Sequence, residues 1–63
     1  MIEGLLNEIR RASEALLTNG TLHSERGNKA AGARARKASL ELERLTNAFR
    51  KASIEADKVK VNK

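Results

Sequence analysis

The sequence predicts an all-α protein: a helical hairpin with a short first helix and a long second helix that assembles as a coiled-coil-like homo-oligomer. Three observations lead to this prediction. The 63 residues contain no proline, and helix-forming residues dominate. Apolar residues recur at helical spacing in two stretches. The chain also lacks cysteine, and a core this small seldom supplies enough stability without disulfides, metals or self-association.

The first helix is expected at about residues 2–18, where apolar residues follow helical spacing and most charged residues lie off that stripe. Gly20 is expected to end it, because glycine accepts the left-handed conformation found at helix ends. A connector is then expected at about residues 19–28, in which Thr21 or Ser24 could cap the next helix.

The second helix is expected at about residues 29–59, followed by a short basic tail at 60–63, all within one domain of residues 1–63. Its apolar residues are spaced alternately four and three apart, which is typical of a coiled-coil seam. The first helix is expected to cover only the first half of this longer helix, so the seam from Phe49 to Val59 is left bare and a second chain is expected to cover it. The seam begins at Ala31, and the predicted oligomer interface is Ala35, Ala38, Leu42, Leu45, Phe49, Ala52, Ala56 and Val59.

A basic stripe is expected on the side of the second helix opposite the seam. The formal net charge is +5, and such a balance favours an anionic partner. With one phenylalanine and no tryptophan or tyrosine, base stacking is unsupported. Duplex DNA, contacted through its phosphates and without sequence reading, is therefore the expected partner. The stripe consists of Lys29, Arg36, Lys37, Arg44, Arg50, Lys51 and Lys58.

The repeats "RKASLE" (36–41) and "RKASIE" (50–55) leave two questions open. Leu40 and Ile54 are expected on the outer face, as a second packing surface between chains, as apolar contacts to a DNA groove, or as ordinary exposed residues. Ser39 and Ser53 follow two basic residues and an alanine, as Ser13 does, a pattern that basophilic kinases accept. Phosphate there would weaken DNA binding, but serine also suits the flank of a tight alanine seam.

Several classes of function are disfavoured. One histidine, His23, and no cysteine provide neither a nucleophile with its base nor a metal site, so no enzyme, cofactor or small-molecule substrate is expected. No apolar run is long enough for a membrane span, and a soluble cytoplasmic protein is expected. The alternative to DNA binding is a helical protein–protein interaction module whose charge serves only solubility.

The segment "ERGNKAA" (25–31), followed by Arg34 and Arg36 and later by "RKASI" (50–54), resembles the bacterial linker-histone-like proteins of chlamydiae and some other bacteria. The resemblance covers about residues 24–58. It implies a nucleoid-associated protein that binds and compacts DNA through a helical, self-associating domain. Arg26 and Lys29 could also grip a phosphate together with amides at the start of the second helix. The basic positions that match the family are Arg26, Lys29, Arg34, Arg36, Arg50 and Lys51.

Overall fold

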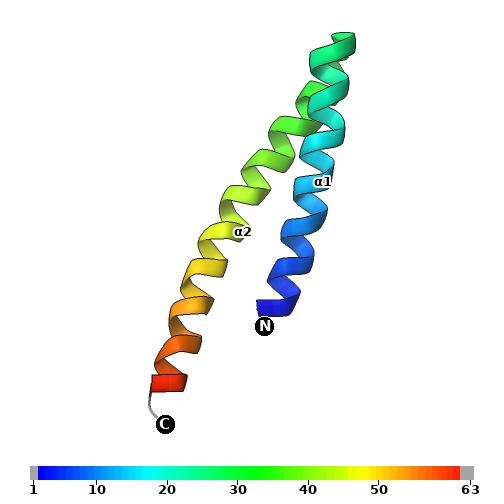
Figure 1. The fold of residues 1–63 in the computed structure, drawn as a ribbon. Coiled ribbons are helices and arrows are strands. Elements are labelled where there is room, and N and C mark those ends of the chain that lie inside the picture. The colour runs from blue at the N-terminus through cyan, green and yellow to red at the C-terminus, as the bar shows by residue number, and fades with distance from the viewer. Residues whose placement is uncertain (1, 62–63) are drawn as a thin grey trace.

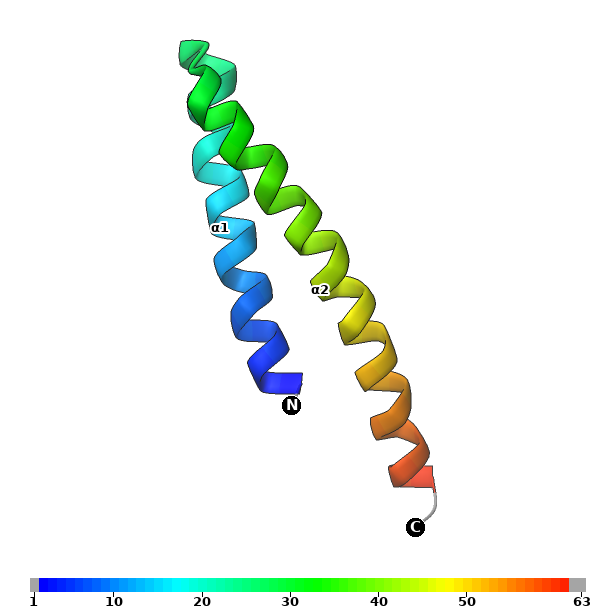
Figure 2. The ribbon, with the colours of Figure 1, turned by 180° about the vertical axis from the view of Figure 1, so that it is seen from behind.

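A computed structural model describes residues 2–61, with side chains described as far as residue 58. Within that range the chain forms two helices and no strand: α1 (Ile2–Arg26) and α2 (Lys29–Val61). The helices run antiparallel as a hairpin and diverge away from the connector (Figures 1 and 2). The resulting rod measures 54 × 14 × 13 Å. The predicted all-α class and helical hairpin are confirmed.

The core is a thin seam between the two helices. Its buried residues on α2 are Ala31, Ala35, Ala38 and Leu45, and α1 contributes Ala12. The α2 residues keep the alternating spacing that places them on one face of a helix. Alanines let the helices approach closely, but each buries little apolar area. Leu45, 2% exposed, is the one large side chain among them that is fully buried.

The connector consists of two residues, Gly27 and Asn28. The first ends α1 and the second caps α2. Gly27 adopts a left-handed conformation with φ of 63°, and its N–H donates to the His23 carbonyl oxygen at 3.0 Å. This is a common way to end a helix. Asn28 then caps α2, since its Oδ1 accepts a hydrogen bond from the Ala31 N–H at 3.0 Å. Two adjacent residues thus stop one helix and start the next.

The predicted end of the first helix was wrong. α1 continues through Gly20 to Arg26, so the expected connector at 19–28 shrinks to two residues, and Thr21 and Ser24 lie inside α1 instead of capping α2. Gly20 is not among the described residues with a positive φ. Leu22 is half-buried, so packing against α2 continues past Gly20. This packing outweighs the low helix propensity of glycine.

The second helix extends beyond its expected end. The predicted basic tail at 60–63 begins inside α2, which includes residues 60 and 61, while residues 62–63 lie outside the described part of the chain. At about 1.5 Å per residue, α2 is about 50 Å long and α1 about 37 Å. The long helix therefore projects past the N-terminus of α1 (Figure 1).

Gly32 permits a close contact between the helices near the connector. It is buried, and a Cβ atom placed on it would lie 2.5 Å from His23 Nδ1. The same nitrogen lies 3.2 Å from the Asn28 carbonyl oxygen. Gly32 therefore provides room for the imidazole at the start of α2, and any side chain there would displace the ring.

Two glycine substitutions are expected to have opposite effects on the free energy of unfolding. Gly27→Ala should destabilise the hairpin by about 1–2 kcal/mol, because an L-residue resists the left-handed conformation. Gly20→Ala should stabilise it by about 0.5–1 kcal/mol, because alanine is the better helix residue. Neither Cβ would meet an atom within 4 Å. Urea unfolding followed by circular dichroism measures both. Destabilisation by Gly20→Ala would contradict the continuous α1.

Candidate nucleic-acid interface

The candidate interface is the outer face of α2, defined here by Lys29, Arg36, Lys51 and Lys58. These residues lie about half a helical turn away from the buried seam, at 100° per residue, and all four are exposed. The seam is held against α1, so the rotation of α2 is fixed and the outer face points away from the hairpin. Packing of the seam against α1 thus leaves the row of cations on the outer face of α2 exposed to solvent.

Two predicted cations are paired with glutamates one turn away. Arg44 Nη2 lies 2.9 Å from Glu41 Oε2, and Lys58 Nζ lies 3.8 Å from Glu55 Oε2. The Arg44 and Lys58 side chains remain 67% and 68% exposed. Exposed pairs of this kind contribute only about 0.2–1 kcal/mol. A phosphate can therefore compete for either cation at little cost.

The remaining cations of α2 have no acidic partner within the described residues. Arg36, Lys37 and Lys51 are exposed and form no ion pair there. Arg50 is also exposed and donates to the neutral carboxamide of Asn47. Lys37 lies toward the flank of α2, so the cations form a band wider than the outer face alone. This band provides several unpaired positive charges along one helix.

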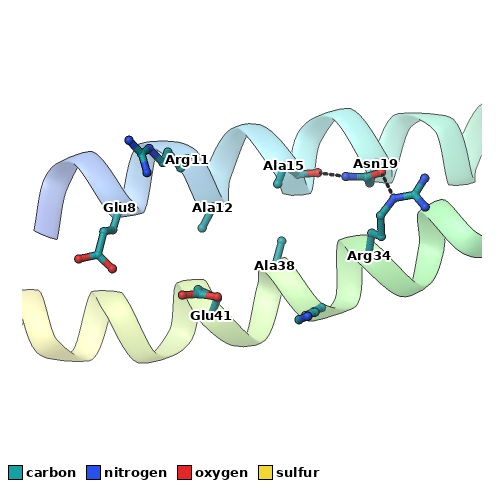
Figure 3. A pocket seen from close by; sticks show the side chains of 9 residues that line it. Glu8, Arg11, Ala12, Ala15, Asn19, Arg34, Ala38 and Glu41 are labelled. Carbon is teal, nitrogen blue, oxygen red and sulfur yellow. Dashed lines mark hydrogen bonds between the residues drawn. The ribbon is translucent and has the colours of Figure 1, made fainter.

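Arg34 has a structural contact that separates it from the outer face. Its Nε donates to Asn19 Oδ1 across the hairpin at 2.8 Å, and Asn19 Nδ2 donates in turn to the Ala15 carbonyl oxygen at 2.9 Å (Figure 3). Arg34 thus lies on the flank that faces α1. Sequence reasoning did not find Asn19, since nothing in a single sequence links residues fifteen apart on different helices.

One further predicted cation, Arg26, lies beside Lys29 at the connector end. Arg26 is the last residue of α1 and Lys29 the first of α2, and both are exposed. The first turn of α2 contains no acidic residue, so its positive dipole end is not neutralised there. The capping role of Asn28 was missed, although asparagine directly before "KAA" is a recognisable N-cap signal.

The predicted oligomer interface divides into two parts. Ala35, Ala38 and Leu45 are buried within the chain, and Leu42 is half-buried. This first part packs against α1 and forms the core of the hairpin. Within the hairpin α1 covers these residues, and their part in a contact between chains stays a prediction. In the second part Phe49, Ala52 and Ala56 are half-buried, and the Val59 side chain lies outside the described residues.

A shallow groove runs between the helices on one flank, with a volume of about 400 Å³. Figure 3 shows its alanine floor and the Glu8 and Glu41 side chains directed into the space between the helices. Because acidic and basic side chains both line this groove, it suits a polyanion poorly. Among the described residues no three His, Asp or Glu side chains cluster as a metal site. The groove is lined by Glu8, Arg11, Ala12, Ala15, Asn19, Arg34, Lys37, Ala38 and Glu41.

Four large apolar side chains are exposed, in two places. Leu40 and Ile54, 68% and 57% exposed, lie on the outer side of α2 among the cations, as expected. Leu6 and Leu17 lie on α1 and are 45% and 68% exposed. Neither helix, over the residues described, is long and apolar enough to cross a bilayer.

The comparison with protein families decides the affiliation of the chain. The family model described as histone H1-like protein Hc1 matches residues 3–59. The chain belongs to this family. No curated protein and no solved structure matches it significantly. The matched range contains nearly all of both helices of the Hc1-type hairpin, including the whole outer face of α2. The predicted resemblance to bacterial linker-histone-like proteins is therefore confirmed, and it extends across α1 as well.

Proposed function

We propose that this chain is a nucleoid-associated, architectural DNA-binding protein that contacts the phosphates of duplex DNA through the outer face of α2. The observation that carries the proposal is the band of exposed cations on α2 of a chain that is a member of the histone H1-like Hc1 family. Lysine and arginine neutralise phosphates, and the counterions released drive binding. The net charge of +5 adds a favourable long-range field.

The length of the band supports a duplex as the ligand. From Arg36 to Lys58 is 22 residues, or about 33 Å along the helix. One turn of duplex DNA has nearly the same length, about 34 Å. A helix of this length lying along the duplex can therefore reach phosphates over a full turn. The length of α2 makes this contact possible, so the hairpin serves as a support for the cationic face.

The chemistry of the band favours binding without sequence preference. Lysine is a flexible point charge, and arginine forms forked contacts to phosphate oxygens. Neither contact reads base identity when it is made to the backbone. The single aromatic residue, Phe49, lies half-buried on the seam side, where it cannot stack on bases. Bridging of duplexes would then come from a homo-oligomer that presents two or more outer faces.

Fluorescence anisotropy on three duplexes of unrelated sequence and equal length tests this function. At low salt we expect binding with dissociation constants that agree within about threefold, since contacts to the phosphates are nearly independent of sequence. A strong preference for one duplex would contradict the mechanism, and no binding to any of them would contradict the function.

A second candidate function is a helical protein–protein interaction module. The four exposed large apolar side chains favour it, because such residues can anchor a partner. The two candidates differ in the same anisotropy experiment. An interaction module without a nucleic-acid role would leave all three duplexes unbound at low salt.

A further inference from the structure

The two hexapeptides "RKASLE" (36–41) and "RKASIE" (50–55) place the same local sequence in two different structural settings. In each copy an arginine and a lysine stand three and two residues before the serine, and the copies differ only at Leu40 and Ile54. An enzyme that reads the local sequence alone would therefore treat Ser39 and Ser53 almost alike. A difference between the two serines must come from the fold.

The hydroxyl groups of both serines are free of hydrogen bonds within the described part of the chain. Thr46, on the same flank of α2, donates its hydroxyl to the Leu42 carbonyl oxygen at 2.8 Å, whereas neither Ser39 nor Ser53 has such a contact to a described residue. Both hydroxyls are thus available as acceptors of a phosphoryl group. Ser39 is exposed and Ser53 is half-buried, so static exposure alone would favour Ser39.

Ser39 lies in the part of α2 that is packed against α1. A kinase must align the serine Oγ with the γ-phosphate of ATP, so the residues on both sides of the serine must leave the helix. Unwinding around Ser39 would remove Ala38 from the core, and unwinding from the free end of α2 would also expose Leu45, both of which are buried. The hairpin core therefore protects Ser39. It protects Ser13 in the same way, because Ala12 before it is buried.

Ser53 lies where α2 has no helix opposite it. The Asn19–Arg34 hydrogen bond sets the register of the antiparallel pair. Seventeen residues before Asn19 is Ile2, the first residue of α1, and seventeen after Arg34 is Lys51. Since both helices rise equally per residue, α1 ends about level with Lys51. The projecting end, residues 52–61, extends past the N-terminus of α1 in both views (Figures 1 and 2).

The projecting end can unwind without loss of the core. Among the described residues after Leu45 none is buried, and the Lys58–Glu55 ion pair at 3.8 Å is exposed. A helical segment of about ten residues is marginal in water without tertiary packing. Local opening of this kind requires less free energy than opening of the packed part. Ser53 and its neighbours are therefore the copy of the motif that can enter the cleft of an enzyme.

We propose that Ser53 is a phosphate-acceptor site for a basophilic Ser/Thr kinase and that the hairpin protects Ser39 from the same enzyme. Arg50 and Lys51 provide the cations that acidic side chains of such a kinase recognise. In the reaction Ser53 Oγ attacks the γ-phosphorus of ATP while the bond to ADP breaks, and the hydroxyl proton passes to the catalytic aspartate of the kinase. ADP leaves with the bonding electron pair.

A phosphate on Ser53 would act on the cation band. It adds about −1.5 to −2 charges and lies one helical turn after Arg50, where it can pair with the guanidinium. Arg50 is then less available to the phosphates of a duplex, and the charge of the whole band falls. We expect duplex binding to weaken on the order of tenfold at about 0.1 M salt. This consequence rests on the proposed function, whereas the selection of Ser53 over Ser39 is independent of DNA.

A phosphorylation time course on the full chain tests the selection. The probe is the catalytic subunit of cyclic-AMP-dependent protein kinase with Mg-ATP, and tandem mass spectrometry measures phosphate at each serine. We expect Ser53 to react at least about tenfold faster than Ser39. The matched control is Leu40→Ile with Ile54→Leu, which exchanges the two residues that differ between the hexapeptides and should keep the preference for Ser53.

A second variant shows whether the hairpin is the cause. Leu45→Ala removes the large buried side chain that lies between the two serines, so Ser39 should react faster and the ratio of the two rates should fall towards one. An unchanged ratio would overturn the proposed protection. Equal rates in the original chain, a faster Ser39, no phosphate at Ser53, or a preference reversed by the Leu40–Ile54 exchange would each overturn the proposal.

Anisotropy with the chain phosphorylated at Ser53 tests the consequence, and kinase-treated Ser53→Ala is the control, which should keep its affinity for the duplex. Equal binding by the phosphorylated and unmodified chains would overturn the proposed effect of the phosphate. An unmodified chain that binds no duplex would contradict the proposed function instead, and the phosphorylation rates would still decide whether Ser53 is the acceptor.

Discussion

Replacing Arg36 and Lys51 together by glutamine is expected to weaken binding to every duplex by 10- to 100-fold at about 0.1 M salt. Each lost phosphate contact removes about 0.9 from the slope of log affinity against log salt. Two lost contacts therefore reduce the steepness of the slope by about 1.8. Both side chains are exposed on the outer face and have no ion pair within the described residues, so their removal should not disturb the fold. Anisotropy titrations at several salt concentrations measure both quantities.

The matched control is Arg10→Gln with Arg11→Gln, which lowers the formal charge from +5 to +3 by the same two units. Both arginines are exposed on α1, away from the outer face of α2. This control should change affinity much less, because it alters only the general field of the molecule. Equal losses from the two double variants would contradict a localised interface and would leave net charge alone as the cause.

Leu45→Ala is expected to cost about 2–5 kcal/mol of unfolding free energy, the usual range for a buried leucine. Leu45 is 2% exposed and is the one large, fully buried side chain described. A chain of this size has a total stability of only about 3–9 kcal/mol at typical values per residue. The substitution should therefore remove most of the cooperative unfolding transition. Thermal and urea unfolding followed by circular dichroism measure the loss.

Leu40→Ala is the matched control, with the same chemical change on the same helix. Leu40 is 68% exposed, and surface substitutions usually stay within about 0.5 kcal/mol. If Leu40→Ala cost as much as Leu45→Ala, α2 would be rotated relative to the position described. The comparison thus tests which face of α2 packs against α1, and therefore which face carries the cations outward.

The second helix was predictable from sequence because its seam is regular. Residues spaced alternately four and three apart define one face of a long helix, and Ala31, Ala35, Ala38 and Leu45 are buried there. The outward direction of Arg36 and Lys51 then follows from the helical period alone. The exposure of Leu40 and Ile54 followed in the same way. The buried and exposed faces of a single helix can therefore be predicted from the spacing of its apolar residues.

The end of the first helix was not predictable in this way. Gly20 and Gly27 look equally suited to end a helix, and only packing against α2 distinguishes them. The left-handed conformation belongs to Gly27, since Asn28 beside it caps the next helix. The same limit applies to Arg34, whose hydrogen bond to Asn19 depends on the register of two helices. Contacts between elements need the register, which the pattern of one helix does not contain.

The most direct test of the central claim, that the exposed cations of α2 bind duplex phosphates, is the salt dependence of binding to a random duplex. With about four to six phosphates neutralised per chain, a plot of log affinity against log salt should be linear with a slope of about −4 to −5. A slope near zero would show that the cations do not contact phosphates, and it would contradict the account.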